Sequence, residues 1–314
     1  MFYFLHLFLS DFEKHLSLNF VWNFFSAPGL TWAAMMRSTQ AEIELISDVD
    51  VLLMIEKGIR GGLTSCNLRY CKDNNPYIPN YEQSKDNTFI AYLDVNNLYG
   101  YALSQMLPKS DFKWIDPSFI DDILQTQQSE DIGYILEVDL HYPEYLHDKH
   151  NDFPLAPEKT KITTDMLSNY QLDLIQKLAE GGYKHIKTQK LVTNFAQKIR
   201  YTIHIENLPL LSKKGLILEK VHRIIGFKQE KWIAPYVSLC TRKRQAATTS
   251  FEKDFWKLLV NSLYGKSIED KRKHVNIKLV IKDCGAEKLL KSIHLSHFWF
   301  LMKTKRYLRC VIIK

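Results

Sequence analysis

The segment 249–266, TSFEKDFWKLLVNSLYGK, constrains the fold most because both of its ends carry helix signals. Thr249 and Glu252 form a T-x-x-E capping box, in which the hydroxyl and the carboxylate accept hydrogen bonds from opposite backbone N–H groups. Gly265 suits the left-handed position just past a helix end. The sequence therefore predicts one helix with a defined start and a defined stop.

At about 100° per residue, this helix has one apolar side and one cationic side. The apolar side consists of Phe251, Phe255, Leu258, Leu259, Ser262 and Leu263. The opposite side consists of Lys253, Lys257, Asn261 and Tyr264. Two ammonium groups, an amide and a phenol suit an anionic ligand that carries a ring, while a solvated lysine face on an ordinary amphipathic helix is the simpler interpretation.

Two motifs in this chain resemble those of family B DNA polymerases. The first is K-x3-N-S-x-Y-G, typical of the fingers helix of that family, which lies at 257–265. The second, YLDVNNLYG at 92–100, resembles the first palm motif, in which an aspartate, here Asp94, ends a strand. The likeness is closest to the protein-primed subgroup of viruses, linear plasmids and Maverick/Polinton-type DNA transposons, and it runs from about 12 to about 282.

The resemblance implies an α+β fold. The expected parts are a partial polymerase palm built on an antiparallel sheet, a helical fingers element, an insertion and a helical N-terminal segment. The implied division is an exonuclease-to-palm connecting segment at 1–87, a palm part with subgroup insertions at 88–240, a fingers helix region at 241–282 and an unassigned basic tail at 283–314.

The resemblance also implies an activity, DNA-directed DNA polymerisation, in which a nucleotide is transferred onto a primer hydroxyl. The implied partners are a DNA template-primer, dNTP and, in the protein-primed mode, a terminal protein. Asp94 would bridge two Mg²⁺ ions, and Lys257 would neutralise charge on the triphosphate. Tyr99 would pack under the sugar, unless it is an ordinary core tyrosine. The implied nucleotide-binding residues are Val95, Leu98, Tyr99, Arg244, Lys253, Lys257, Asn261, Tyr264 and Gly265.

The second metal-binding motif of the family is not found in this sequence. No D-x-D follows Gly265, and we identify no exonuclease start. One carboxylate cannot readily hold two divalent ions against polyphosphate oxygens. We therefore expect a truncated polymerase that does not extend a primer alone, with a non-catalytic nucleic-acid-binding remnant as the alternative.

The charge of the chain is uneven. The segment from Lys184 to Lys282 holds 22 Lys and Arg against 7 Asp and Glu, whereas the whole chain has a net charge of +7. A basic half beside an acidic half suits a polyanion on one face. The resemblance implies that Arg60, Gly61 and Gly62 contact the template strand, unless they form a plain glycine turn. Arg242 and Lys243 precede the fingers helix and are expected to meet DNA phosphates, unless they form a solvated basic turn.

Two segments contain residue types that are common in metal sites: one is acidic and the other is rich in histidine. The D-x-D at Asp48 and Asp50 precedes the first palm motif instead of following it, so we expect no metal there. A second run holds His141, His147, Asp148, His150 and Asp152. Its spacing fits no standard zinc pattern, yet it leaves a metal-binding protein as a third hypothesis.

The sequence indicates a cytoplasmic or nuclear protein. The five cysteines are odd in number and include no C-x-x-C, so a disulfide framework is not expected. The apolar start, MFYFLHLFL, has no basic leader and is too short to span a bilayer, so neither a signal peptide nor a membrane span is expected.

Periodicity predicts the other elements. Helices are expected at 11–24, 30–37 and 164–180, and strands at 88–95, 132–142 and within 215–227, with the segments 187–192 and 200–205 paired to each other.

Overall fold

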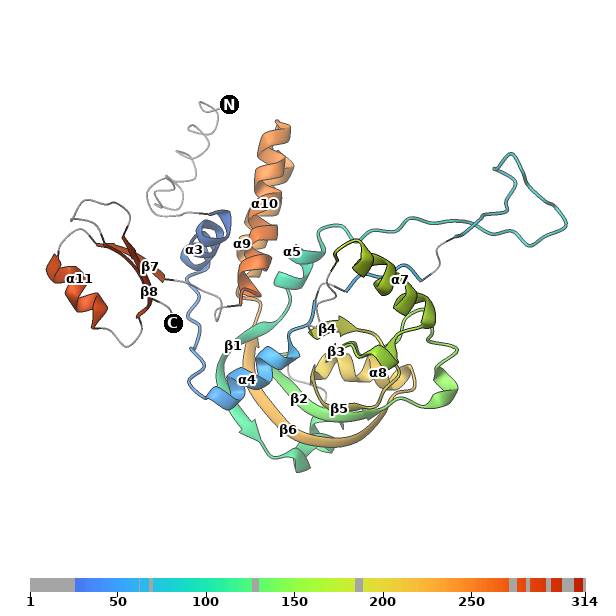
Figure 1. Ribbon diagram of the computed structural model, residues 1–314, viewed down its shortest axis with the longest axis horizontal. Coiled ribbons are helices and arrows are strands. Elements are labelled where there is room, and N and C mark those ends of the chain that lie inside the picture. The colour runs from blue at the N-terminus through green and yellow to red at the C-terminus, as the bar shows by residue number, and fades with distance from the viewer. Residues whose placement is uncertain are drawn as a thin grey trace.

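The computed structural model describes residues 26–61, 63–67, 70–125, 130–183, 189–270, 276–280, 283–291, 295–300 and 308–312. The fold is α+β, as expected, with an antiparallel sheet and a separate layer of helices (Figure 1). The predicted helix at 11–24 lies outside the described residues. Within them, no helix is both long and apolar enough to cross a membrane.

The central sheet has four strands in the order β1-β6-β2-β5, and each neighbouring pair is antiparallel. The strands are β1 (Leu107–Ile115), β2 (Ile132–His141), β5 (Lys198–His204) and β6 (Ile217–Glu230). β2 and β6 confirm the strands predicted at 132–142 and within 215–227. The predicted pairing of 187–192 with 200–205 is wrong, because β5 pairs with β2 and the first segment joins a different sheet.

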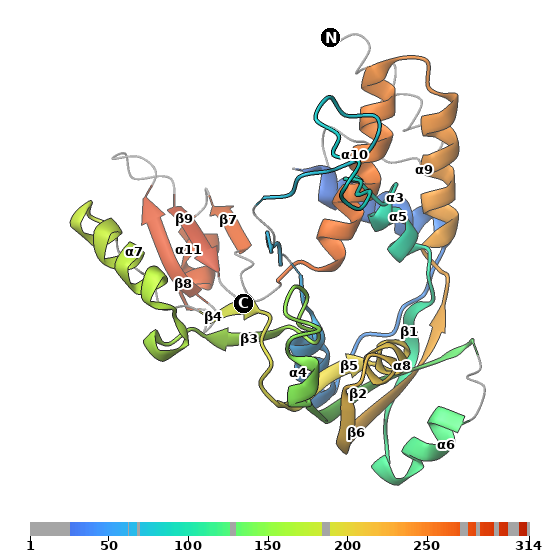
Figure 2. The same cartoon turned by 90° about the vertical axis from the view of Figure 1, so that its right-hand side faces the viewer.

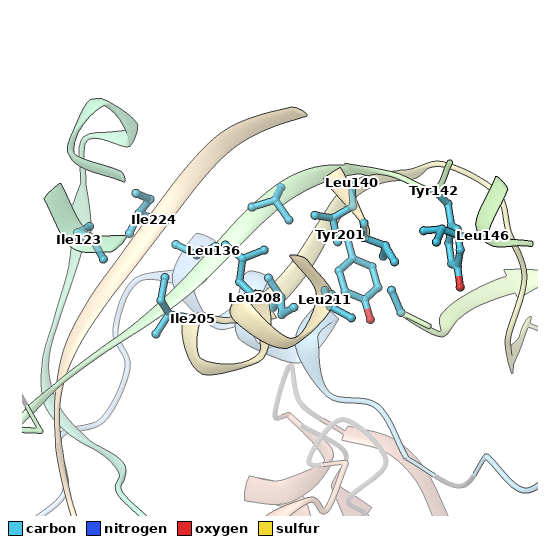
Figure 3. Packing of buried hydrophobic residues seen from close by; sticks show 14 residues of the cluster. Ile123, Leu136, Leu140, Tyr142, Leu146, Tyr201, Ile205, Leu208, Leu211 and Ile224 are labelled. Carbon is cyan, nitrogen blue, oxygen red and sulfur yellow. The ribbon is translucent and has the colours of Figure 1, made fainter. Parts of the chain in front are cut away.

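Both faces of this sheet are covered, because successive side chains of a strand point to opposite sides. On one face, Leu136 and Leu140 of β2 pack with Leu208 of α8 (Leu208–Lys213) in the main core (Figure 3). On the other face, Phe227 of β6 packs against Met54 of α4 (Val49–Gly58). The sheet is therefore a scaffold sealed on both sides.

Smaller elements lie outside the central sheet. β3 (Glu158–Lys161) pairs with β4 (Gln189–Val192), and α7 (Asn169–Glu180) lies between them in the chain. The helix predicted from 164 begins at Asn169, because Ser168 and Gln171 form a capping box there. The other elements are α6 (Ile120–Gln125), α11 (Asp283–Leu290) and a sheet of β7 (Asn276–Val280), β9 (Leu308–Ile312) and β8 (Leu295–Phe300), with short 3-10 turns at Pro117–Phe119, Glu144–Leu146, Thr164–Met166 and Ile205–Asn207.

The helical layer consists of α3 (Ala27–Thr39), α5 (Leu98–Leu103), α9 (Ala234–Ala246) and α10 (Ser250–Ser267) (Figure 2). α3 starts earlier than predicted, because Pro28 fits the first turn of a helix. One buried hydroxyl links three of these helices. Thr31 Oγ1 donates to the Leu259 carbonyl at 3.0 Å, so in its 2.9 Å bond with Tyr236 the phenol must be the donor.

The helix predicted at 249–266 is present as α10, with two differences. Thr249 caps it as expected, but Gly265 lies inside the helix, which ends at Ser267. The buried side is rotated by about 90° from the predicted one at 100° per residue. Its buried residues are Trp256, Leu259, Val260 and Leu263, while Phe251 and Leu258 are exposed.

The rotation arises because α10 packs against α3, α5 and α9 together. These three helices bury a part of the α10 surface that differs from its most apolar side. As a consequence, the side with Lys253, Lys257 and Tyr264 borders the packed interface and does not lie opposite to it.

The predicted buried strand at 88–95 is wrong. Within the described part of the chain, only Thr88 forms a bridge, to Asn74, and residues 89–95 form no strand. Tyr92 and Leu93 are almost fully exposed, and the segment belongs to the long blue-green excursion on the right of Figure 1. An apolar composition favours a strand, but a strand also needs a neighbour that accepts its hydrogen bonds, and the described residues supply none here.

Candidate functional site

A pocket of about 260 Å³ joins the two sequence motifs. It lies where the start of α5 meets α9 and α10, which pack against one another. Its lining residues are Asn97, Cys240, Thr241, Arg244, Gln245, Lys253, Trp256, Lys257 and Val260. Asn97 belongs to the motif at 92–100 and Lys257 to the motif at 257–265, so segments about 160 residues apart in the sequence share one cavity.

The backbone positions Asn97 in this pocket. Asn97 has a left-handed conformation with φ of 55° and precedes α5, and its carbonyl accepts a hydrogen bond from Tyr101 N at 2.9 Å. Asparagine is one of the few residues that tolerate this conformation. A Cβ on Gly100 would lie 2.3 Å from Asn97 Nδ2, so the glycine of the motif leaves the space that the amide occupies.

Three cations in the pocket lack partners. Arg244, Lys253 and Lys257 are exposed, and none of their side chains forms an ion pair or hydrogen bond with another described residue. The Cys240 thiol adds no charge, because burial raises its pKa to about 12. Adjacent cations without carboxylates attract an anion with several charges, such as a polyphosphate.

Two aromatic rings, one from each motif, stack on each other. The ring centroids of Tyr99 and Tyr264 lie 4.3 Å apart, with an angle of 18° between the ring planes. Tyr99 belongs to α5 and Tyr264 to α10, so the stacked rings form a direct contact between the two motifs. Both rings were predicted to contact a nucleotide, but neither is among the lining residues of the cationic pocket.

The remaining residues of the predicted nucleotide site do not line the pocket. Asn261 is half-buried on α10, and Gly265 is exposed near its end. Val95 and Leu98 are exposed at the start of the α5 region.

Asp94 is exposed in the extended segment before α5. The described residues include no group of three or more His, Cys, Asp or Glu placed to hold a metal ion. A pair of Mg²⁺ ions needs several oxygen ligands on rigid backbone. The described donor set therefore does not fit the two-ion site that the resemblance implies.

The predicted DNA contacts divide into two kinds. Arg60 is used by the fold, because its guanidinium lies 3.8 Å from the centre of the Tyr201 ring and donates to the Thr202 carbonyl at 2.7 Å. Lys57 likewise donates to the Arg200 carbonyl at 2.7 Å. Since β5 is an edge strand, these side chains satisfy carbonyls that have no neighbouring strand.

The other predicted DNA contacts are more accessible. Gly61 is exposed, and Gly62 lies outside the described residues. Lys243 is half-buried on α9. Arg242 is exposed and lines a second cavity, of about 400 Å³.

The D-x-D motif has a structural explanation. Asp48 is the N-cap of α4, and its carboxylate accepts hydrogen bonds from Asp50 N at 2.8 Å and from Trp114 Nε1 at 2.9 Å. The Trp114 bond, followed by those from the backbone, lowers the pKa of Asp48. Asp50 is exposed in the first turn of the same helix.

The histidine-rich run is also engaged in packing. Tyr142 OH lies 2.8 Å from His150 Nδ1, and the His147 ring stacks on Phe195 at 4.4 Å. His141, Asp148 and Asp152 are exposed, and no metal-binding group is found among the residues that the structure describes.

Sequence reasoning missed part of the pocket. Asn97 stands inside the motif at 92–100, where its left-handed preference was a usable signal. Trp256 lies between Lys253 and Lys257 in the sequence of α10. It could be predicted as a pocket residue only if the buried side of α10 was predicted correctly. Thr241 and Gln245 carry no motif, because they reach the pocket through the packing of α9.

The described fold is similar to solved structures of Phi29 DNA polymerase. The match to its complex with primer-template DNA has a TM-score of 0.46 at 15% identity and covers 88% of this chain and 40% of that chain. The ternary complex with incoming nucleotide gives 0.45 at 15% identity over 88% and 41%, and the orthorhombic crystal form gives 0.44 at 14% identity over 83% and 39%.

This chain thus spans about two-fifths of the length of the solved polymerase. No family model and no curated protein matches its sequence.

Proposed function

We propose that this chain carries the nucleotide-binding side of a DNA-directed DNA polymerase of family B. The observation that supports this proposal most is the pocket in which Asn97 faces Arg244, Lys253 and Lys257. A polymerase must hold an incoming triphosphate beside the residues that follow its first palm motif. The same pocket combines that motif with unpaired cations.

In this proposal the cations receive the triphosphate and the tyrosines receive the nucleoside. Lys257 and Lys253 lie one helical turn apart, so their ammonium groups can contact neighbouring phosphates, and Arg244 adds planar donors from α9. Tyr99 and Tyr264 would open or tilt to admit a sugar and base. Asn261, next on the same helix side, would contact the nascent base pair.

The reaction itself needs groups that the described residues do not provide. In phosphoryl transfer, the protein contributes mainly positioning and charge neutralisation. Asp94 supplies only one exposed carboxylate for this purpose. We therefore expect the chain to bind nucleotide and DNA but not to extend a primer alone. Protein priming, a terminal protein partner, an origin in a mobile element and the division at 87, 240 and 282 belong to this proposal and rest on the sequence resemblance.

Nucleotide binding by the full chain tests the proposal. In calorimetric titrations with dGTP, the unmodified chain should bind, and Lys257→Ala should weaken binding about tenfold, the usual effect of one charge-assisted hydrogen bond. Lys266→Ala is the matched control, because Lys266 is on the same helix but forms an ion pair with Glu269 at 2.6 Å. Equal affinities for dGTP in the unmodified chain and Lys257→Ala would contradict the proposal.

A second measurement separates the enzyme from the alternative, a non-catalytic nucleic-acid-binding remnant, which the unpaired cations also favour. Template-dependent incorporation with Mg²⁺ or Mn²⁺ should be absent, while DNA binding should weaken with salt. Robust synthesis that Asp94→Ala abolishes would show a complete active site. DNA binding without dGTP binding would favour the remnant.

A further inference from the structure

We infer that the chain forms a weak dimer through α7, which packs antiparallel against α7 of a second copy. α7 (Asn169–Glu180) is a helix of 12 residues, and none of them is buried. In Figure 2 it lies apart from the central sheet. The inference does not depend on the proposed nucleotide site, because no residue of α7 lines that pocket.

A helix of this length needs a packing partner. Isolated helices shorter than about 12–15 residues are marginal in water, and most helices in proteins are stabilised by burial of an apolar side. The capping box of Ser168 and Gln171 fixes the start of α7 but buries no apolar surface. A second copy would supply the burial that the described residues do not give this helix.

The apolar side chains of α7 form a stripe along one side of the helix. Tyr170, Leu174 and Leu178 follow one another at spacings of four residues, so they lie within an arc of about 80°. They are 66%, 42% and 44% exposed. Ile175 is half-buried and extends the stripe at its middle. A contiguous exposed apolar stripe is typical of an interaction surface.

Two charges beside this stripe favour a second copy as the partner. Asp173 and Lys177 flank the same edge of the stripe, about 60° and 20° from Tyr170, and neither forms an ion pair with a described residue. In an antiparallel pair of α7 helices with the two-fold axis near Ile175, Asp173 of each copy faces Lys177 of the other. A two-fold interface repeats each contact, so the charge pattern of one helix forms two ion pairs with itself.

The size of the interface sets the strength of the dimer. One pair of short helices buries less than the about 1,200–2,000 Å² of a standard protein interface, so association should be weak and should depend on concentration. Exposed ion pairs contribute little affinity. The apolar stripe therefore supplies most of the affinity, and the charges select the antiparallel orientation.

Sedimentation velocity of the full chain between about 1 and 100 μM tests the dimer. The sedimentation coefficient of the unmodified chain should rise with concentration. Leu174→Asp should weaken association about tenfold or more, because it places an unpaired carboxylate in the stripe. Leu172→Asp is the matched control, since Leu172 is 36% exposed on the same helix but lies about 160° from Leu174.

An exchange of charges tests the antiparallel orientation. Asp173→Lys and Lys177→Asp should each associate about tenfold more weakly than the unmodified chain, because each variant places like charges opposite one another. An equimolar mixture of the two variants should recover the affinity, because each lysine of the first variant then faces an aspartate of the second. An ion pair within one helix would not produce this recovery.

The outcomes decide the inference without reference to nucleotide binding. Protection of the α7 amides against hydrogen exchange that rises with protein concentration supports it. An unmodified chain that stays monomeric up to about 100 μM overturns it and leaves the stripe to a different partner. Equal weakening by Leu174→Asp and Leu172→Asp, or a mixture of charge variants that associates no better than its components, overturns it as well.

Discussion

Buried charged side chains are paired in the sheet, whereas the charged side chains of the pocket in the helical layer are exposed and unpaired among the described residues. In the sheet, the Glu137 side chain is only 2% exposed and accepts hydrogen bonds from Arg223 at 2.9 and 3.2 Å and from Lys57 at 3.3 Å. Lys198 is fully buried and donates to Glu158 at 2.9 Å. In the helical layer, Arg244, Lys253 and Lys257 of the pocket between α5, α9 and α10 are exposed, and their side chains have no described partner.

This difference distinguishes a scaffold from a binding surface. A buried charge is costly unless it is paired and hydrogen-bonded, so the charges of the sheet must satisfy one another. Exposed cations at the edge of a packed helix interface keep their hydration and remain free for a ligand. The fold therefore depends on the first group and hardly on the second.

The largest effect is expected at Glu137. Glu137→Gln removes the carboxylate around which Arg223, Lys57 and Arg200 gather, and it should lower the free energy of unfolding by about 3 kcal/mol. Urea denaturation monitored by circular dichroism measures this. A loss below about 0.5 kcal/mol would mean that the sheet does not depend on its paired charges.

A smaller loss is expected at the hydroxyl that links the helices. Thr31→Val leaves the Leu259 carbonyl and the Tyr236 phenol without their partner and should cost about 1–3 kcal/mol. Thr31→Ser keeps the hydroxyl and serves as control. If both variants unfold at the same urea concentration, the hydrogen bonds contribute nothing and packing alone holds the layer.

The sheet should also respond to acid. Burial alone raises the pKa of Glu137, but Arg223 and Lys57 outweigh it and hold this pKa below its usual value. The Arg200 N–H and then His222 lower the pKa of Asp139. A group with a depressed folded pKa contributes its full stability above its unfolded pKa, near about 4, and this contribution is lost as the pH falls from the unfolded pKa through the lower folded pKa. The urea concentration at the unfolding midpoint should therefore decrease when the pH is below about 5, and it should decrease less in Glu137→Gln than in the unmodified chain.

The smallest effect on stability is expected in the pocket. Lys257→Ala should change the free energy of unfolding by less than about 0.5 kcal/mol, because Lys257 is exposed and unpaired among the described residues. The same denaturation experiment measures it beside Glu137→Gln. A loss as large as that of Glu137→Gln would remove the distinction between scaffold and binding surface.

Local sequence signals predicted several elements well. The cap at Thr249, the strand at 132–142 and the α+β class were recoverable, because capping and alternation act within a few residues. The role of Asp48 as a helix cap and partner of Trp114 was not foreseen.

What was missed depends on contacts between distant segments. The partner of β5, the buried arc of α10 and the exposed state of residues 89–95 are each set by which elements meet, and periodicity does not report that. The resemblance gave Asp94 and Lys257 roles in one reaction, but the pocket that Lys257 lines contains Asn97 of the first motif and not Asp94.

The central claim is that both motifs form one nucleotide site, and a double-mutant cycle tests it most directly. The affinity for dGTP is measured for the unmodified chain, Asn97→Ala, Lys257→Ala and the double variant. If both residues contact one bound nucleotide, the two losses should be non-additive by about 0.5–3 kcal/mol. Losses that add to within about 0.3 kcal/mol would show that the motifs act independently and would contradict the account.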